Sequence, residues 1–243
     1  MSKLAIFNNF NVMEAVNLRK AALIVVDVQN DFVDGSLSIL DAPAKQNPYE
    51  IIEPINNLID RDLFGLVICT KDWHPEAHIS FLASVTNDDR MVSAESTKPK
   101  YDLYDEVEFI HPVKTKQVLY PSHCVMKTEG AELYSKLRSK NAQIVYKGYN
   151  TFCDSYSAFF DNNKSNETEL NNILRQANID TVFVCGLAHE YCVKFTALDA
   201  SELGFKTFML TDCTRGLNEE LMIKADKELA QSGVIQIDSK LLF

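Results

Sequence analysis

The chain has 243 residues, of which 46% are hydrophobic and 24% charged, and it carries a formal net charge of -10. This length and composition predict one soluble globular domain, residues 1–243, with a sizeable buried core. The acidic balance argues against nucleic acid or an anionic membrane as the main partner. No apolar run is long enough to cross a bilayer.

Short apolar runs alternate with segments of helical spacing along the chain. Each run is typical of a fully buried parallel strand, and this alternation predicts a parallel sheet with helices on both faces. We therefore expect an α/β protein with three layers, αβα, around a mostly parallel sheet of about six strands. The expected strands are Ala22–Val28, Leu66–Thr70, Gln143–Tyr146, Thr181–Gly186, Thr207–Thr211 and Val234–Ile237. The expected helices are Glu50–Asp60, Glu129–Lys140, Asn166–Ala177, Tyr191–Leu203 and Leu217–Gln231. Asn166 and Glu169 have the spacing of a capping box at the start of the third helix.

The segment 83–117 interrupts this alternation. It is polar and has no clear periodicity. Because structureless connections of this length are uncommon and usually functional or disordered, we interpret it as an insertion and a candidate cover for the site. The first residues, Met1 to Arg19, lack the pattern of a secretory signal. We therefore expect a cytoplasmic protein, with the nucleus as a further location.

Polar residues follow several of the predicted strands, where open α/β sheets place their ligands. Asp72 and His74 flank Trp73, so on an extended strand end their side chains point to the same side. With His123 they form a mixed carboxylate and imidazole set, which suits zinc, iron or manganese. An isolated pair of this kind is more typical of ordinary surface residues, but three of the five histidines follow strand ends and strengthen the interpretation as a metal site. His78 is either a fourth ligand or a residue that supports the others.

Six cysteines are spread along the chain without a CxxC pair, and most are expected to be small, buried free thiols. Cys192 differs because it lies between a predicted strand and a predicted helix. A helix N-terminus stabilises both a thiolate and an oxyanion formed beside it. Asp27, at the end of the first strand, is a candidate base for this thiol, and Lys147 supplies a positive charge.

Five blocks of this sequence resemble the nicotinamidase branch of the isochorismatase-like hydrolases. They are VVDVQNDF, TKDWHPEAHISF, YPSHC, YKGYNTFCDSYSAFFDN and VCGLAHEYCVKFTALDA, and together they span nearly the whole chain. The resemblance implies an enzyme of NAD salvage that hydrolyses nicotinamide to nicotinate and ammonia through a cysteine thioester, and that also acts on pyrazinamide. Isochorismatases proper resemble the chain less at the Asp-x-His pair and the distant His, so these positions favour nicotinamide.

The resemblance also implies roles for individual residues. The catalytic set falls on Asp27, Lys147 and Cys192. One divalent metal ion, Zn²⁺ or else Fe²⁺ or Mn²⁺, falls on Asp72, His74 and His123. A cis peptide between Leu187 and Ala188 turns the amides of Ala188 and Cys192 toward the substrate oxygen as an oxyanion hole. The residues implied in substrate binding are Phe32, Tyr120, Tyr156 and Leu187.

Two positions depart from the family pattern. Tyr120 replaces the usual Trp, and His189-Glu190 replaces the usual Thr-Asp. We expect His189 to face solvent. Two alternatives remain: a related amidase that acts on another small amide, such as a carbamoyl compound, and an inactive binding protein with the same fold. The presence of Asp27, Lys147 and Cys192 argues against the second. The expected partner is a small-molecule substrate, and the sequence leaves open whether the chain forms a homo-oligomer.

Overall fold

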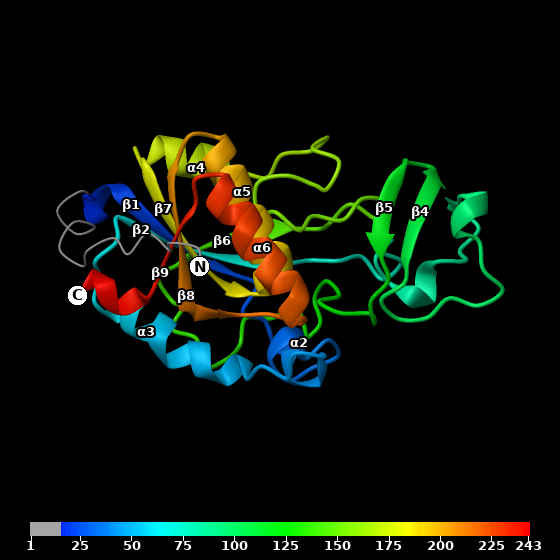
Figure 1. Cartoon of the computed structure of the whole chain (residues 1–243), viewed down its shortest axis with the longest axis horizontal. Helices are drawn as coiled ribbons and strands as arrows, with labels where there is room; N and C mark the ends of the chain where they lie inside the picture. Colours follow the sequence, from blue (N-terminus) through cyan, green and yellow to red (C-terminus); the bar gives the residue numbers. More distant parts are fainter. Residues whose placement is uncertain (1–15) are drawn as a thin grey trace, which may run out of the picture.

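The computed structural model describes residues 16–243 and has a parallel sheet at its centre (Figure 1). Its strands are β1 (Ala21–Val26), β2 (Leu66–Asp72), β6 (Gln143–Lys147), β7 (Thr181–Leu187), β8 (Lys206–Arg215) and β9 (Ile235–Ile237). They lie in the order β6-β2-β1-β7-β8-β9, and every neighbouring pair is parallel. The predicted six-stranded sheet is confirmed.

Helices cover both faces of this sheet. The helices are α2 (Asn30–Val33), α3 (Ile52–Asp60), α4 (Leu170–Gln176), α5 (Lys194–Glu202) and α6 (Glu219–Gln231). Figure 1 shows α3 on one side of the sheet and α4, α5 and α6 on the other. Successive side chains of a strand point to opposite faces. Leu23 and Val25 accordingly join the core with α3, while Ala22 and Ile24 join the core with α4 to α6.

The boundaries of several elements differ from the predicted ones at the edge where polar residues gather. β1 ends at Val26, and Asp27 has a φ of 49°. β2 and β6 instead continue through Asp72 and Lys147, which pair with each other across the two strands. A π-helical turn, His189–Val193, precedes α5. Cys192 therefore lies within this turn and not in the first turn of an α-helix.

One helix prediction is wrong, and a second helix begins later than predicted. The segment 129–140 forms turns, because its backbone bonds to the residues that follow β1: Asn30 N–H donates to Glu132 and Tyr134 N–H donates to Val28. The capping box at Asn166 does not form either. α4 begins at Leu170, whose N–H donates to the Thr168 hydroxyl at 3.1 Å.

The segment 83–117 contains regular structure, contrary to the sequence prediction. β3 (Met91–Val92), β4 (Glu106–His111) and β5 (Thr115–Val118) form an antiparallel sheet, called the small sheet below, which extends from one end of the main body (Figure 1). It has its own apolar core of Ile79, Val85, Val107, Phe109 and Leu119. Only Val107 and Phe109 alternate as buried residues within β4, which is too short a pattern to stand out in a polar segment.

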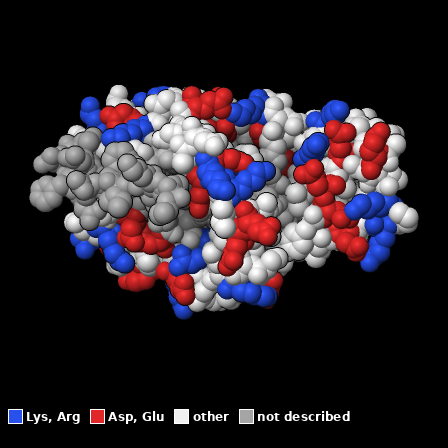
Figure 2. All heavy atoms as spheres, in the orientation of Figure 1, with Lys and Arg blue, Asp and Glu red and all other residues white. Residues whose placement is uncertain are grey.

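None of the described helices has the length and apolar character needed to cross a membrane. The sequence prediction about a secretory signal rests on residues that lie mostly outside the described range. Acidic and basic side chains are interspersed over the face drawn in Figure 2, on the main body and on the small sheet alike.

Candidate active site

Four polar side chains converge at the carboxyl edge of the parallel sheet. Asp27 follows β1, Asp72 and Lys147 end β2 and β6, and Cys192 lies in the turn after β7. These are neighbouring strands in the sheet, so residues far apart in sequence become neighbours in space. The structure therefore brings together the three residues predicted to be catalytic.

Lys147 is the centre of this group. Its side chain is completely buried, and its Nζ lies 2.9 Å from Asp27 Oδ2 and 3.4 Å from Cys192 Sγ. The same ammonium contacts Asp72 and donates to the carbonyl oxygen of Ser155 at 2.8 Å. Burial works against its charge, but Asp27 and Asp72 outweigh burial and raise the pKa of Lys147 well above its ordinary value. It is therefore a fixed positive charge between two carboxylates and a thiol.

Asp27 is also completely buried. Its Oδ1 accepts a hydrogen bond from the Thr70 hydroxyl at 2.6 Å. Burial raises the pKa of Asp27 to about 6, against the lowering effect of Lys147 and the Thr70 hydrogen bond. A carboxylate with a pKa near neutrality is well matched to accepting and returning a proton.

Cys192 is 6% exposed, and it is the described cysteine that borders a cavity at this edge of the sheet, which is described below as the inner cavity. Burial raises the pKa of its thiol well above the ordinary value, although Lys147 lowers it. Burial therefore favours the neutral thiol, whereas Lys147 favours the thiolate that the sequence suggested. The peptide bond between Leu187 and Ala188 is cis, as the family resemblance implied.

The predicted metal ligands form a second group, which shares Asp72 with the first. Candidate ligand atoms of Asp72, His74 and His123 all lie within 4.8 Å of one another, and all three side chains are buried. Nδ1 of His74 is 2.7 Å from Gly148 O, and Nδ1 of His123 is 2.8 Å from Pro121 O. These contacts leave each Nε2 for the site. That of His74 is buried, has no hydrogen-bond partner among the described residues and lies 3.6 Å from Asp72 Oδ2. One carboxylate and two imidazoles in this arrangement fit a divalent transition metal.

Gly148 allows His74 to take this position. Its φ is +68°, and a Cβ there would lie 2.5 Å from Cε1 of His74. Any larger residue would therefore displace the imidazole as well as strain the backbone.

His78 packs against this trio. Its ring stacks on His74 with centroids 4.0 Å apart, and its Nδ1 is 2.7 Å from the Ser80 hydroxyl. Its Nε2 has no hydrogen-bond partner among the described residues and lies 4.0 Å from Asp154 Oδ1. This position is compatible with either of the two roles considered for His78.

A small cavity, called the inner cavity below, joins the thiol to the candidate metal ligands. Its lining residues are Phe32, Leu37, Asp72, Tyr120, His123, Asp154, Tyr156, Ala188, Tyr191, Cys192 and Leu217. Three of the four predicted substrate-binding residues are in this wall. Leu187, the fourth, is instead fully buried in the core on the α3 side of the sheet.

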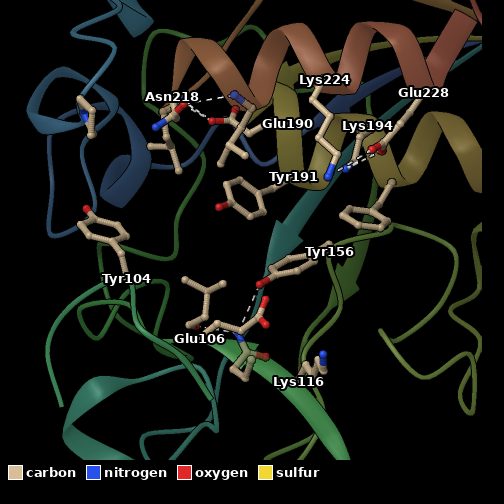
Figure 3. Close-up of a pocket in the computed structure, with 16 residues that line it drawn as sticks. Tyr104, Glu106, Lys116, Tyr156, Glu190, Tyr191, Lys194, Asn218, Lys224 and Glu228 are labelled. Carbon is tan, nitrogen blue, oxygen red and sulfur yellow. Dashed lines mark hydrogen bonds and ion pairs between the residues drawn. The ribbon is translucent and has the colours of Figure 1, made fainter. Parts of the chain in front are cut away.

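A larger hollow of about 570 Å³ adjoins the inner cavity and shares Tyr156, Tyr191 and Leu217 with it. Figure 3 shows Tyr104, Glu106 and Lys116 on one side of this outer hollow, and Glu190, Lys194 and Lys224 on the opposite side. The first group belongs to the small sheet and to the residues just before β4. The segment 83–117, which the sequence predicted to be an insertion, therefore forms one wall of the approach to the inner cavity.

Comparison with known proteins identifies the family. Residues 21–240 match the Isochorismatase domain. The chain belongs to the isochorismatase family. A nicotinamidase of Saccharomyces cerevisiae is 36% identical, over 89% of this chain and 98% of its own length. A solved Acinetobacter baumanii nicotinamidase and pyrazinamidase superposes with a TM-score of 0.78 at 36% identity, covering 93% of this chain and 99% of the other. A Pyrococcus horikoshii pyrazinamidase solved in complex with zinc superposes with a TM-score of 0.68 at 31% identity, covering 90% and 99%.

His189 is one of the residues at which this isochorismatase-family chain departs from the family's sequence pattern, and its exposure differs from the prediction. We expected a solvent-facing side chain, but His189 is only 9% exposed. Its Nε2 lies 2.9 Å from Asp226 Oδ1 of α6, away from the inner cavity. Glu190 is also buried, and its Oε1 accepts from the N–H groups of Leu217 at 2.9 Å and Asn218 at 2.7 Å (Figure 3).

Sequence reasoning missed several residues of the inner cavity. Asp154 is the most prominent, because it is a buried carboxylate that lies between His78 and the cavity. It lies within the fourth family block, two residues before Tyr156, so its position beside a predicted site residue was a usable signal. Leu37 and Leu217 come from connecting segments and gave no such signal.

Proposed function

We propose that this chain is a nicotinamidase, which hydrolyses nicotinamide to nicotinate and ammonia in NAD salvage. The observation that carries the proposal is the position of Lys147, whose ammonium contacts a candidate base, a candidate nucleophile and a candidate metal ligand at once. Aromatic side chains in the wall of the inner cavity suit a flat heteroaromatic ring. The relatives named as nicotinamidases support the choice of substrate.

In the proposed reaction, Asp27 takes the proton of the Cys192 thiol as the sulfur attacks the carboxamide carbon. Lys147, held between them, stabilises the negative charge on both groups. The amides of Ala188 and Cys192 stabilise the oxyanion. Asp27 then gives the proton to the departing ammonia, which leaves an acyl thioester on Cys192. Asp27 next removes a proton from water, which attacks the thioester carbon and releases nicotinate and the thiol.

The proposed metal site consists of Asp72, His74 and His123. A zinc ion bound there would supply a ligand position for the ring nitrogen of the substrate. Because Asp27, Lys147 and Cys192 already provide a base, a positive charge and a nucleophile, the protein activates the thiol with its own residues. Phe32, Tyr120 and Tyr156 enclose the ring, and pyrazinamide, which has the same carboxamide on a diazine ring, is a second proposed substrate.

Ammonia release from nicotinamide tests the proposal. The intact chain should release ammonia, and a chelator should raise KM strongly. Cys192→Ala should abolish turnover but still bind nicotinamide, whereas Cys213→Ala, a buried cysteine of β8, should keep most of the activity per folded molecule. Turnover by Cys192→Ala at a tenth of the wild-type rate would remove the nucleophile assignment. Faster turnover of aliphatic or carbamoyl amides than of nicotinamide would favour the related amidase.

A further inference from the structure

Gln117 joins the small sheet to the wall of the inner cavity. It lies on β5, at the end of the segment 83–117, and is only 1% exposed. Its Nε2 lies 3.2 Å from Asp154 Oδ2, 3.4 Å from the Tyr156 hydroxyl and 2.9 Å from Val118 O. Its Oε1 is buried and has no hydrogen-bond partner among the described residues. Native proteins rarely keep a buried polar atom unpaired, so this amide is expected to have a role beyond packing.

The Asp154 carboxylate and the Tyr156 hydroxyl accept hydrogen bonds from the Gln117 amide, and both residues border the inner cavity. The other carboxylate oxygen of Asp154 accepts from Ser155 N–H at 2.7 Å, so Gln117 completes the orientation of this carboxylate. The Tyr156 hydroxyl also forms a hydrogen bond with the Tyr120 hydroxyl, at 3.4 Å. In Figure 3, Tyr156 lies between Tyr191 of the π-helical turn and the residues of the small sheet, Glu106 and Lys116.

We propose that Gln117 is a positioning residue for substrate binding, which orients Asp154 and Tyr156 so that the inner cavity fits a heteroaromatic ring. The proposal rests on the nicotinamidase function proposed above. It gives one residue of the small sheet, Gln117, a part in substrate recognition. Among the described residues Gln117 has no hydrogen bond to the thiol or to Lys147, and it is not part of the wall of the inner cavity, so its effect falls on binding and not on the chemical steps.

Gln117→Met tests this role, because methionine keeps the length of the side chain and removes both amide donors. We expect KM for nicotinamide to rise about tenfold with kcat changed less than about threefold. The rate of Cys192 alkylation in the absence of substrate should stay unchanged. If Gln117 acts partly through the Tyr156 hydroxyl, Tyr156→Phe should raise KM by less in the Gln117→Met background than in the wild type.

Val107→Ala is the matched control, since it loosens the apolar core of the small sheet without removing a contact to Asp154 or Tyr156. It should lower the melting temperature and leave KM nearly unchanged. An equal rise of KM in Val107→Ala and Gln117→Met would show that Gln117 only anchors the sheet, and an unchanged KM in Gln117→Met would refute the inference while the proposed function stands. A wild-type chain that releases no ammonia from nicotinamide would overturn both.

Discussion

Asp27 is a completely buried carboxylate beside Lys147. The pH dependence of the activity should reveal its role as a base. Its folded pKa is raised to about 6 by burial. A base must be unprotonated, so kcat/KM should be full above this pH and fall about tenfold per pH unit below it. The Thr70 hydrogen bond lowers this pKa. In Thr70→Val the acid limb should therefore move to higher pH, as a profile from pH 5 to 8 would measure.

Thr207→Val is the control for that profile, because Thr207 is a buried threonine of β8 whose hydroxyl bonds only to Phe205 O in the described chain. Its acid limb should coincide with the wild type. An unshifted limb in Thr70→Val would mean that a group other than Asp27 controls the acid side.

Cys192 should be the first cysteine to react with iodoacetamide, since it borders the inner cavity and the other five are 0–2% exposed. Because burial raises the pKa of its thiol, the reaction should accelerate as pH rises. Peptide mapping before and after a chelator should show the same first site. Nicotinamide should protect Cys192 only in the metal-loaded protein. A chelated protein that stays folded but has an unreactive Cys192 would contradict the view that the protein activates the thiol unaided.

The connection between β8 and α6 depends on one carboxylate from another element. Oε1 of Glu190 accepts from two consecutive backbone N–H groups, those of Leu217 and Asn218. Glu190→Ala leaves both donors without this acceptor and should lower the free energy of unfolding by about 2 kcal/mol. Since Leu217 borders the inner cavity, KM should rise as well.

Glu190→Gln keeps an oxygen at the same position, so its loss of stability in denaturant should be less than half that of Glu190→Ala. Equal losses in the two variants would show that the negative charge matters more than the hydrogen-bond acceptor.

At the level of elements, the strands of the parallel sheet could be predicted because each is an apolar run buried on both faces. All six residues of β1 are completely buried. The segment 129–140 shows the limit of this reasoning. Leu137 is buried and Leu133 is partly buried, as a helical pattern would require. The backbone nevertheless pairs with the loop after β1, and such long-range bonds leave no local signal.

The candidate site could be predicted where its residues lie at the ends of strands, as Asp27, Asp72 and Lys147 do. The position of Lys147 between two carboxylates could not, because it depends on the order of strands in the sheet. The contact between Asp154 and Gln117 was missed for a related reason. Their importance comes from a contact between the small sheet and the main body, and nothing in either segment alone indicates the other.

For the whole molecule, the stability of the sheet should be separable from the chemistry at its edge. Phe183 of β7 stacks on Phe208 of β8 with centroids 4.6 Å apart and is completely buried. Phe183→Ala should lower the free energy of unfolding by about 3–5 kcal/mol, measured by denaturant titration. Ile223→Ala, at a residue of α6 that is 56% exposed, should change it by less than about 0.5 kcal/mol.

Activity per folded molecule should stay near the wild-type value in both variants, because neither residue borders the inner cavity. A specific loss of kcat in Phe183→Ala would show that packing within the sheet controls the alignment of the edge residues.

The strand order has a consequence for how the chain is made. β1 lies between β2 and β7, so on the ribosome one edge of this fully apolar strand can pair early, while the other stays open until Thr181–Leu187 has emerged. Open apolar edges promote association between nascent chains. A product that stops before Thr181 holds Asp27, Asp72 and Lys147 but has neither Cys192 nor the strand that closes β1. Premature termination should therefore yield aggregation-prone fragments without activity, and translation must pass β7 before the enzyme exists in any form.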